Sequence, residues 1–196
     1  MFICIEGNIG AGKSTLAKAL TQKLKAHYLP EQFEDSTLLP LFYKDSKSFA
    51  FPTEYSFLID RQKQLTNYFA ATKKNTVTVS DFHFDKCICY AKANLSNADF
   101  TFYKKHFKAI QQTLPVPDLI VFLDVQPILL MENIKKRGRA FEKKLPKKYL
   151  FALKETLDKY YLSKNNTRTT VLTLPIKKYT PHTIEECCDK IMATIR

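Results

Sequence analysis

A glycine-rich segment near the start of the chain limits the folds that this sequence can adopt. Residues 7–14 read Gly-Asn-Ile-Gly-Ala-Gly-Lys-Ser, which satisfies the pattern G-x-x-x-x-G-K-[S/T] in full. The apolar run Phe2–Ile5 before this segment predicts a short buried strand, and apolar residues recur at helical spacing from Leu16 to Leu24 after it. A strand, a glycine loop and a helix in this order form the opening unit of an α/β fold.

The residue types of this loop suit the binding of a phosphate group. Glycines let successive backbone N–H groups turn inward around a phosphate, and the following helix adds the positive end of its dipole. In such loops the lysine, here Lys13, reaches the outer phosphates, and the hydroxyl of Ser14 is a ligand of Mg²⁺. We therefore predict a bound nucleoside triphosphate with Mg²⁺. The predicted nucleotide-binding residues are Gly7, Asn8, Ile9, Gly10, Ala11, Gly12, Lys13, Ser14 and Thr15.

The rest of the chain continues the alternation of strands and helices. Residues 76–79, 119–123 and 169–174 predict further strands, and the run 119–123 is continuously apolar, as in a parallel sheet buried on both faces. Helices are expected over about 48–72, 83–95, 98–113 and 147–163, after Pro127 and after Pro181. No internal repeat or linker interrupts the 196 residues. We predict one doubly wound α/β domain over residues 1–196, with a five-stranded parallel sheet flanked by helices.

Composition argues against several other classes of protein. Apolar residues make up 45% of the chain, too many for a disordered protein. No apolar stretch approaches the roughly 18 residues of a membrane span. The N-terminus lacks a basic segment before its apolar residues, which Glu6 interrupts, so it does not resemble a signal peptide. Five cysteines without a C-x-x-C pair argue against a disulfide scaffold or structural zinc site. A cytoplasmic protein without membrane association is expected.

Basic residues are concentrated in one part of the chain. Residues 131–150 contain eight Lys or Arg and two Glu, which is half of the total surplus of +12. Such a block indicates a polyanion, either a nucleic acid or the phosphates of one nucleotide, or else a solvated helix face. Arg137 and Arg139 are separated by one residue, and their fixed donor geometry suits a lid over transferring phosphates. We place this lid at about residues 136–146.

An acidic residue follows the expected second strand. Glu31 lies in the segment Leu29-Pro30-Glu31, which would emerge at the carboxyl ends of the strands, beside the phosphate loop. A carboxylate there can accept a proton from an attacking hydroxyl. A plain surface acid is the alternative.

Several motifs together resemble the deoxynucleoside kinases of the deoxycytidine/deoxyguanosine kinase family over nearly the whole chain. They are the loop 7–15, the segment Leu41-Phe42-Tyr43-Lys44-Asp45 followed by Ala50-Phe51-Pro52, the motif Arg137-x-Arg139-x-x-Glu142, and Ser80–Lys86, which is similar to a bacterial branch. The resemblance implies a P-loop kinase fold with a helical lid. It also implies transfer of the γ-phosphoryl group of ATP, or another nucleoside triphosphate, to the 5′-hydroxyl of a deoxynucleoside in nucleotide salvage. A homodimer with no nucleic acid partner is expected.

The same resemblance implies individual roles. Glu31 stands at the position of the general base, and Arg137 and Arg139 at positions that contact phosphates. Tyr43 would hold the sugar 3′-hydroxyl, and Glu142 would make a second contact to it.

The chain departs from the family pattern after the third strand. Where the family has an acid followed by Arg-Ser, this sequence has Asp81-Phe82-His83. Asp81 preserves the acid and is the expected partner of Ser14 for Mg²⁺, but the arginine is missing. Lys86 is the candidate replacement for its charge, as a point charge rather than a fork. An alignment of Asp85-Lys86 with the acid-Arg pair is the alternative.

A second departure concerns the base. Glu54 occupies the position of a base-reading glutamine, and an ionised carboxylate only accepts hydrogen bonds. Guanine presents two adjacent donors, so an ionised Glu54 predicts a preference for deoxyguanosine or for purines generally. A different base-reading residue is the alternative.

Two other functions compete with this interpretation. A thymidylate-kinase-like nucleoside monophosphate kinase would need an extra cationic contact for the phosphate of the acceptor. A P-loop nucleic-acid-binding or switch protein would use the basic block 135–148, and nucleic acid binding would weaken steeply with salt.

Overall fold

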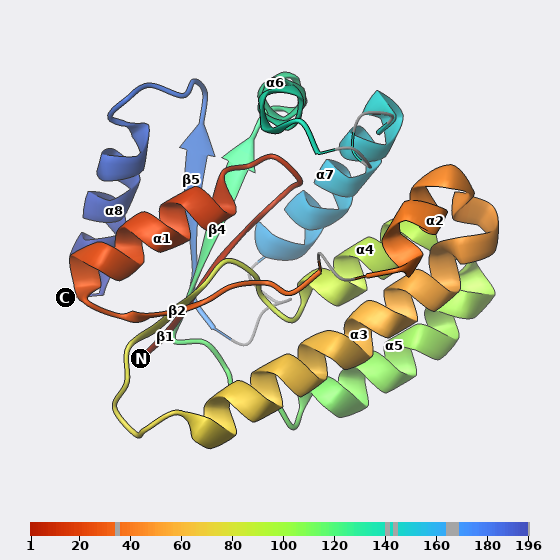
Figure 1. Ribbon diagram of the computed structural model, residues 1–196, viewed down its shortest axis with the longest axis horizontal. Helices are drawn as coiled ribbons and strands as arrows, with labels where there is room; N and C mark the ends of the chain where they lie inside the picture. Colours follow the sequence, from red (N-terminus) through yellow and green to blue (C-terminus); the bar gives the residue numbers. More distant parts are fainter. Residues whose placement is uncertain (34–35, 140–141, 143–144, 164–168, 196) are drawn as a thin grey trace.

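The structure is a computed structural model that describes residues 1–33, 36–139, 142, 145–163 and 169–195. Its strands form a single parallel sheet in the order β2-β3-β1-β4-β5 (Figure 1). The strands are β1 (Phe2–Gly7), β2 (His27–Leu29), β3 (Thr78–Ser80), β4 (Leu119–Val125) and β5 (Val171–Ile176). The helices are α1 (Lys13–Leu24), α2 (Leu38–Lys44), α3 (Ser46–Ala71), α4 (Lys86–Asn94), α5 (Asn97–Gln111), α6 (Pro127–Arg137), α7 (Lys147–Tyr161) and α8 (Thr183–Thr194).

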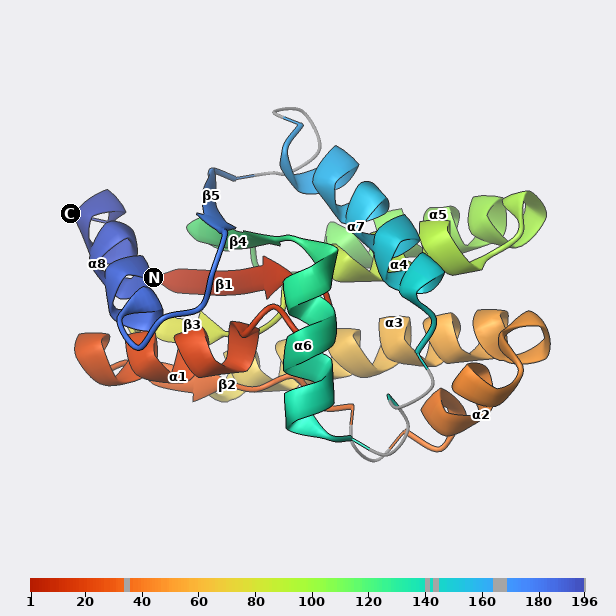
Figure 2. The same cartoon turned by 90° about the horizontal axis from the view of Figure 1, so that it is seen from above.

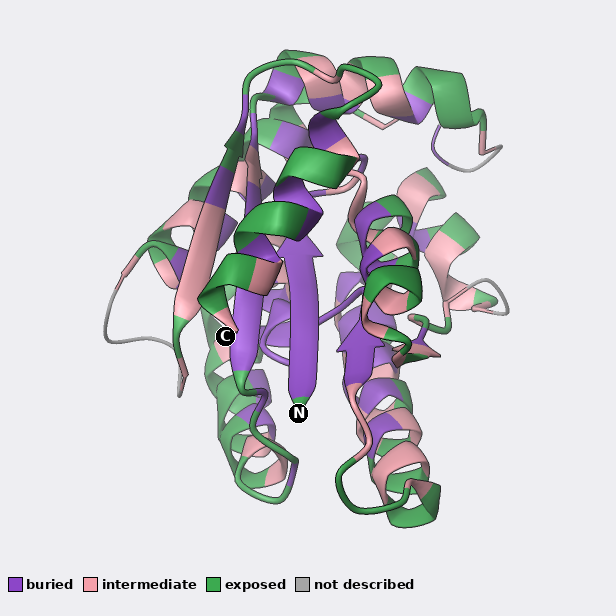
Figure 3. Ribbon diagram, turned by 90° about the vertical axis from the view of Figure 1, so that its left-hand side faces the viewer, coloured by how far each residue is buried: buried purple, intermediate pink, exposed green. Residues whose placement is uncertain are grey.

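Helices cover both faces of the sheet, because the side chains of a strand alternate between two apolar cores. In β1, Ile3 and Ile5 belong to the core built with α1, α6 and α8, whereas Phe2 and Cys4 belong to the core built with α3, α4, α5 and α7. Figure 2 shows these two groups of helices on either side of the strands. All six residues of β1 are buried, and Figure 3 shows the buried central strands behind the exposed outer faces of the helices. The predicted doubly wound parallel sheet is thus confirmed.

The ends of some strands and helices differ from those predicted from the sequence. The last strand runs over 171–176 rather than 169–174, because it pairs in register with β4 from Ile120↔Val171 to Val125↔Ile176. Pro175 is tolerated there because β5 is an edge strand. The short helix α2 was not predicted. The helix expected from residue 83 begins at Lys86, because residues 81–85 first form the turn that follows β3.

The carboxyl ends of the strands meet at one edge of the sheet, and the chemically important segments follow them. The glycine loop follows β1, Glu31 follows β2, Asp81 follows β3, and α6 follows β4. Strand order reverses at β1, which is where ligands bind in doubly wound sheets. Among the residues that the structure describes, no helix combines the length and the apolar character of a membrane span.

Candidate active site

The glycine loop has the backbone that a phosphate cradle requires. Three of the four glycines of the chain lie in it, and each has a positive φ. Gly10 has φ 82°, and a Cβ atom at this position would lie 2.7 Å from the carbonyl oxygen of Leu130. Only glycine fits both the left-handed backbone and this close approach of α6.

Lys13 lies at the centre of the loop. Its Nζ donates hydrogen bonds to the carbonyl oxygens of Gly7 (2.9 Å) and Asn8 (3.0 Å). Burial, together with the charge of Lys86, lowers the pKa of Lys13 to about 8, so the ammonium form still predominates at pH 7. This charge is therefore held where phosphate oxygens would enter the loop.

Neighbouring elements hold the loop from outside. The buried side chain of Asn8 faces α7 and donates to the carbonyl oxygen of Leu150 at 3.0 Å, so only the backbone of Asn8 is left for a phosphate. Asn133 of α6 donates to the carbonyl oxygen of Gly10 (2.8 Å), and the hydroxyl of Tyr179 donates to that of Ala11 (2.9 Å). Our sequence analysis missed Asn133 and Tyr179, which come from distant segments and belong to no motif.

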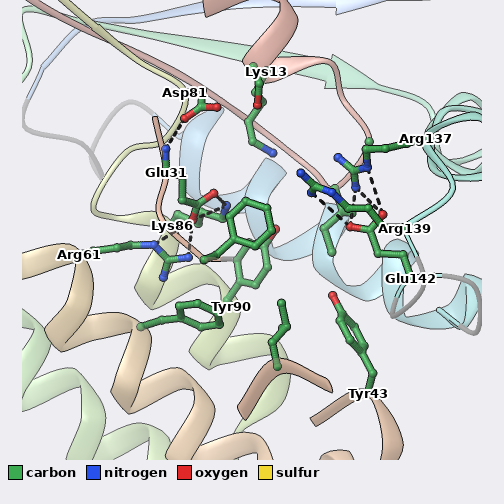
Figure 4. Close-up of a pocket in the computed structure, with 16 residues that line it drawn as sticks. Lys13, Glu31, Tyr43, Arg61, Asp81, Lys86, Tyr90, Arg137, Arg139 and Glu142 are labelled. Atoms are coloured by element: carbon green, nitrogen blue, oxygen red, sulfur yellow. Dashed lines mark hydrogen bonds and ion pairs between the residues drawn. The ribbon is translucent and has the colours of Figure 1, made fainter. Parts of the chain in front are cut away.

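Two cavities of the described structure are lined by both Gly10 and Lys13 of the loop. The first, which we call the donor cavity, has about 460 Å³. It is lined by Gly10, Ala11, Gly12, Lys13, Ser14, Thr15, Asn133, Arg137, Arg139, Tyr179 and Ile184. The second, the acceptor cavity, has about 100 Å³ and is shown in Figure 4. It is lined by Ile9, Gly10, Lys13, Ser14, Glu31, Phe33, Leu39, Tyr43, Phe57, Arg61, Asp81, Lys86, Tyr90, Arg137, Arg139 and Glu142.

The two cavities share five lining residues. The shared residues are Gly10, Lys13, Ser14, Arg137 and Arg139. Gly7 and Asn8 line neither cavity, because they lie behind the loop against β4 and α7. A phosphate bound in the loop would therefore face both cavities at once.

Glu31 is an ion-paired carboxylate at the wall of the acceptor cavity. Lys86 Nζ lies 2.7 Å from Glu31 Oε2, and Arg61 donates to Glu31 Oε1 from both Nε (3.0 Å) and Nη2 (Figure 4). Burial alone would raise the pKa of Glu31, but Lys86 and Arg61 outweigh burial and hold this pKa well below its usual range. Glu31 is thus ionised at neutral pH.

Arg61 is a site residue that our sequence analysis missed. It is 5% exposed and lies on the core-facing side of α3, between Leu58 and Leu65. Its position in the sequence between two apolar residues at helical spacing could have identified it, because an arginine is rarely buried without a partner. Together with Lys86 it places positive charge beside the Glu31 carboxylate.

Asp81 connects three parts of the site. Its Oδ1 accepts a hydrogen bond from the backbone N–H of Glu31, and its Oδ2 accepts one from the hydroxyl of Tyr28, each at 2.7 Å. Asp85 instead accepts from Gln111 (2.6 Å) and Tyr160 (2.7 Å), on the side of α5 and α7, and lines neither cavity. Asp81 thus lines the acceptor cavity and Asp85 does not, whereas Lys86, the residue after Asp85, lines it as well.

Ser14 and Asp81 form a donor set suited to Mg²⁺. Both line the acceptor cavity, and the remaining lone pairs of the Asp81 carboxylate are not used by its two hydrogen bonds. The described residues contain no group of three or more His, Cys, Asp or Glu that could hold a metal alone. This fits Mg²⁺, which is usually bound by one or two protein oxygens together with phosphates and water.

The two lid arginines converge on one acid. Glu142 is 5% exposed and accepts from Arg137 Nε at 3.1 Å and from Arg137 Nη2, while Arg139 Nη1 lies 3.7 Å from its Oε1. The guanidinium of Arg139 also stacks over the ring of Phe33 at 4.7 Å. Within the predicted lid 136–146, residues 140–141 and 143–144 lie outside the described residues. In the sequence this lid lies between the end of α6 and the start of α7, and its residues Arg137 and Arg139 line both cavities.

Aromatic side chains form the other wall of the acceptor cavity. Tyr43 of α2 lies there, and burial, together with Glu142 and Glu54, raises its pKa. Phe57 and Tyr90 add ring faces, and the buried hydroxyl of Tyr90 has no hydrogen-bond partner among the described residues. Flat apolar faces with a free polar group suit a planar, partly polar ligand such as a nucleoside.

Glu54 lies deeper than predicted. It is 3% exposed and does not line the acceptor cavity, although Phe57 and Arg61 on the same side of α3 do. Burial raises the pKa of Glu54 to about 7, against the hydrogen bond from Asn94 and the charges of Arg61 and Lys86. Burial therefore favours the protonated carboxyl, in contrast to the ionised carboxylate assumed from the sequence.

The parallel sheet, the glycine loop and the paired cavities define a P-loop kinase. The family model of the deoxynucleoside kinases matches residues 3–196, and the chain belongs to the deoxynucleoside kinase family. The family predicted from the sequence motifs is thus confirmed.

Several known proteins are similar to this chain. A deoxyguanosine kinase of Bacillus subtilis is 39% identical over 152 residues, which cover 76% of this chain and 72% of the relative. A deoxyadenosine kinase of Lactobacillus acidophilus is 32% identical over 148 residues, covering 71% and 68%. The solved structure of a deoxyadenosine kinase from M. mycoides with dCMP and a flexible dCDP bound has a TM-score of 0.86 at 23% identity, covering 100% of this chain and 98% of that one. This last comparison shows the shared fold.

Proposed function

We propose that the protein transfers the γ-phosphoryl group of ATP to the 5′-hydroxyl of a purine deoxynucleoside. The observation that carries this proposal is the junction of the two cavities at Gly10, Lys13, Ser14, Arg137 and Arg139. A triphosphate in the donor cavity would place its terminal phosphate at this junction, facing an acceptor on the other side. Positioning of this kind, with charge stabilisation, accounts for most of the catalysis of phosphoryl transfer.

Glu31 is the proposed general base. Its carboxylate is ionised at neutral pH and would take the proton of the 5′-hydroxyl as the oxygen attacks the phosphorus atom. Lys86 and Arg61 fix both carboxylate oxygens at the cavity wall, so the base is already oriented before the acceptor binds. The thymidylate-kinase-like alternative would need a further cation for an acceptor phosphate, whereas the cations at Glu31 are engaged by its carboxylate.

Two arginines and a lysine are proposed to stabilise the negative charge of the γ-phosphoryl group during its transfer. Lys13 would exchange its bonds to the loop carbonyls for phosphate oxygens, while Arg137 and Arg139 would turn their donors from Glu142 toward the phosphoryl oxygens. Mg²⁺, held by Ser14 and Asp81, would neutralise phosphate charge when bound.

The sugar and base are proposed to lie along the aromatic wall. Tyr43 and Glu142 face the same cavity and would bind the 3′-hydroxyl, and the base would extend toward α3, where Glu54 lies. The acceptor cavity of about 100 Å³ is smaller than the roughly 300–1,000 Å³ of usual ligand pockets, so we expect Glu142 and the lid arginines to move outward as the acceptor enters. The purine preference is supported by relatives named deoxyguanosine and deoxyadenosine kinase.

We also propose a cytoplasmic homodimer. All five cysteines are free and buried thiols, which suits a reducing compartment. A groove of about 930 Å³ between α4, α5 and α7 contains the rings of Phe100 and Phe107, and Phe151 of α7 is 56% exposed. Light scattering after size-exclusion chromatography should give twice the 22.7 kDa mass of the chain, and a mass of one chain would contradict the dimer.

A label-transfer assay tests the proposed reaction. The protein, Mg²⁺ and ATP labelled in the γ-phosphate are incubated with each of the four deoxynucleosides and each of their 5′-monophosphates. We expect labelled dGMP and dAMP as the main products. Labelled diphosphates formed only from the monophosphates would instead assign a nucleoside monophosphate kinase, and hydrolysis without transfer would favour a switch protein.

A further inference from the structure

One oxygen of the Glu54 carboxyl group accepts a hydrogen bond, and the other oxygen has no hydrogen-bond partner among the described residues. Oε1 accepts a hydrogen bond from Asn94 Nδ2 at 2.6 Å. Oε2 is buried and has no hydrogen-bond partner among the described residues. A buried acceptor without a hydrogen bond lowers the stability of the fold. We therefore take Oε2 as a place where a ligand atom would form the missing hydrogen bond.

Asn94 is itself held in place. The same Nδ2 group donates its second proton to the hydroxyl of Tyr149 at 3.2 Å, so both N–H bonds of the amide are used. Asn94 ends α4, Tyr149 belongs to α7 and Glu54 to α3, and the three side chains therefore connect three helices. This arrangement fixes which carboxyl oxygen of Glu54 is left free.

Glu54 lies on the face of α3 that also carries two residues of the acceptor cavity. Glu54, Phe57 and Arg61 are spaced i, i+3 and i+7, which places them on one face of the helix, and the latter two line the acceptor cavity. The base of a nucleoside whose 5′-hydroxyl is at Glu31 would extend along this face. In this respect the inference rests on the proposed function.

The surroundings leave the protonation state of Glu54 finely balanced. Burial raises its pKa to about 7, whereas the hydrogen bond from Asn94 and the charges of Arg61 and Lys86 lower it. The titratable, charged or polar groups that act on it from the helices packed around it are Tyr43 of α2, Arg61 of α3, Lys86, Cys87 and Asn94 of α4, Tyr103 of α5 and Tyr149 of α7. Both forms of the carboxyl are therefore accessible near neutral pH.

The two purines differ at the atom that such an oxygen would meet. Guanine carries a proton on N1 and donates there, whereas N1 of adenine has no proton and accepts. We propose that Asn94 holds the Glu54 carboxyl so that one proton on Oε2 selects the substrate: the carboxylate accepts a hydrogen bond from guanine N1–H, and the carboxylic acid donates one to adenine N1. Asn94 is then a positioning residue for base choice, and the preference between deoxyguanosine and deoxyadenosine depends on pH.

The ratio of kcat/KM for deoxyguanosine to that for deoxyadenosine tests this proposal between pH 5.5 and pH 8.5. Because both substrates use the same ATP, P-loop and general base, the ratio cancels the titration of those groups. If each purine binds only one form of Glu54, the ratio rises by about tenfold per pH unit. Deoxyinosine, which has the N1 proton of guanine but lacks the exocyclic amine, should follow deoxyguanosine. A ratio that does not change with pH would overturn the proposal.

Variants test the part played by Asn94. Asn94→Ala removes the hydrogen bond that favours the ionised carboxyl, so the ratio at pH 7 should fall by about tenfold while its slope with pH is kept. Asn97→Ala, three residues further on an exposed surface, is the matched control and should leave the ratio unchanged. In Glu54→Gln the ratio should lose its pH dependence. An unchanged ratio in Asn94→Ala would refute the positioning role.

One further measurement keeps a failure of this inference distinct from a failure of the proposed reaction. A ¹³C NMR titration of the glutamate carboxyl carbons, with Glu54→Gln to assign the signal, should give a midpoint near pH 7 that moves upward in Asn94→Ala. This titration needs no catalysis, so it tests the site even if the proposed reaction is wrong. A midpoint near the ordinary value of 4.5 would refute the inference and leave the kinase assignment intact.

Discussion

Replacing Glu31 by glutamine separates the chemical role of this residue from its structural role. Glu31→Gln keeps the volume but removes the negative charge that faces Lys86 at 2.7 Å and Arg61 at 3.0 Å. Both cations are at most 7% exposed, so the variant leaves two buried positive charges without an anion. Removing one partner of a buried ion pair costs about 3–5 kcal/mol, and because glutamine still accepts one hydrogen bond we expect about 3 kcal/mol.

The expected losses are large enough to measure separately. For a chain of this length, 3 kcal/mol lowers Tm by roughly 6–12 °C. Loss of the proton acceptor lowers kcat by about 10² or more, with little change in KM. Urea unfolding without nucleotide gives the first quantity, and a coupled ADP-release assay gives the second.

A double variant decides between the two roles. Glu31→Gln with Lys86→Met removes one of the unpaired cations, so stability should recover in part, whereas activity should remain lost. Activity that returned together with stability would show that Glu31 acts only through the fold. Turnover of the single variant at the wild-type rate would refute the general-base assignment altogether.

The other predictions concern the remaining parts of the site. Lys13→Ala should abolish transfer and leave the fold intact by circular dichroism; a folded variant with normal turnover would contradict the phosphate-loop assignment. Arg137→Lys and Arg139→Lys keep the charge but lose the two-pronged donor geometry, so kcat should fall in both. Because the pKa of Glu54 is raised to about 7, its stabilising contribution is complete below pH 4.5 and is lost as pH rises through 7. Glu54→Gln should therefore gain stability relative to wild type with rising pH, by on the order of 3 kcal/mol, and a difference that stays constant with pH would contradict the raised pKa.

Local patterns were sufficient to predict the framework of the fold. The glycine loop could be placed because its conformation depends on glycines at fixed offsets between a strand and a helix. The run Leu119–Leu123 was identified as a buried strand because a parallel sheet covered on both faces needs apolar side chains in both directions. The short helix α2 was missed, since seven residues carry too little periodicity to indicate a helix.

The site could be predicted where a motif or the order of strands marks it. Arg137 and Glu142 belong to a family motif, Glu31 follows the second strand at the carboxyl edge of the sheet, and the structure brings all three to one cavity. Arg61, Asn133 and Tyr179 were missed because their contacts join segments far apart in sequence. Lys86 could be named as a candidate replacement, but its contact with Glu31 depends on where the start of α4 lies relative to the segment after β2, which no local pattern encodes.

The burial of Glu54 could not be predicted either. From the sequence it was a carboxylate facing a base, because ionisation is the ordinary state of a glutamate at neutral pH. Its protonation depends on how completely three helices exclude water from one carboxyl group. Effects of this kind follow from tertiary packing alone.

A crystal structure with deoxyguanosine and ADP bound would test the central claim most directly, through the distance from the nucleoside 5′-oxygen to the Glu31 carboxylate. We expect this distance to be about 2.6–3.2 Å, as required for proton transfer, with the 5′-oxygen pointing toward the glycine loop and the base edge beside Glu54. A 5′-oxygen turned away from Glu31, with this carboxylate still enclosed by Lys86 and Arg61 and out of reach of the acceptor, would contradict the proposed mechanism.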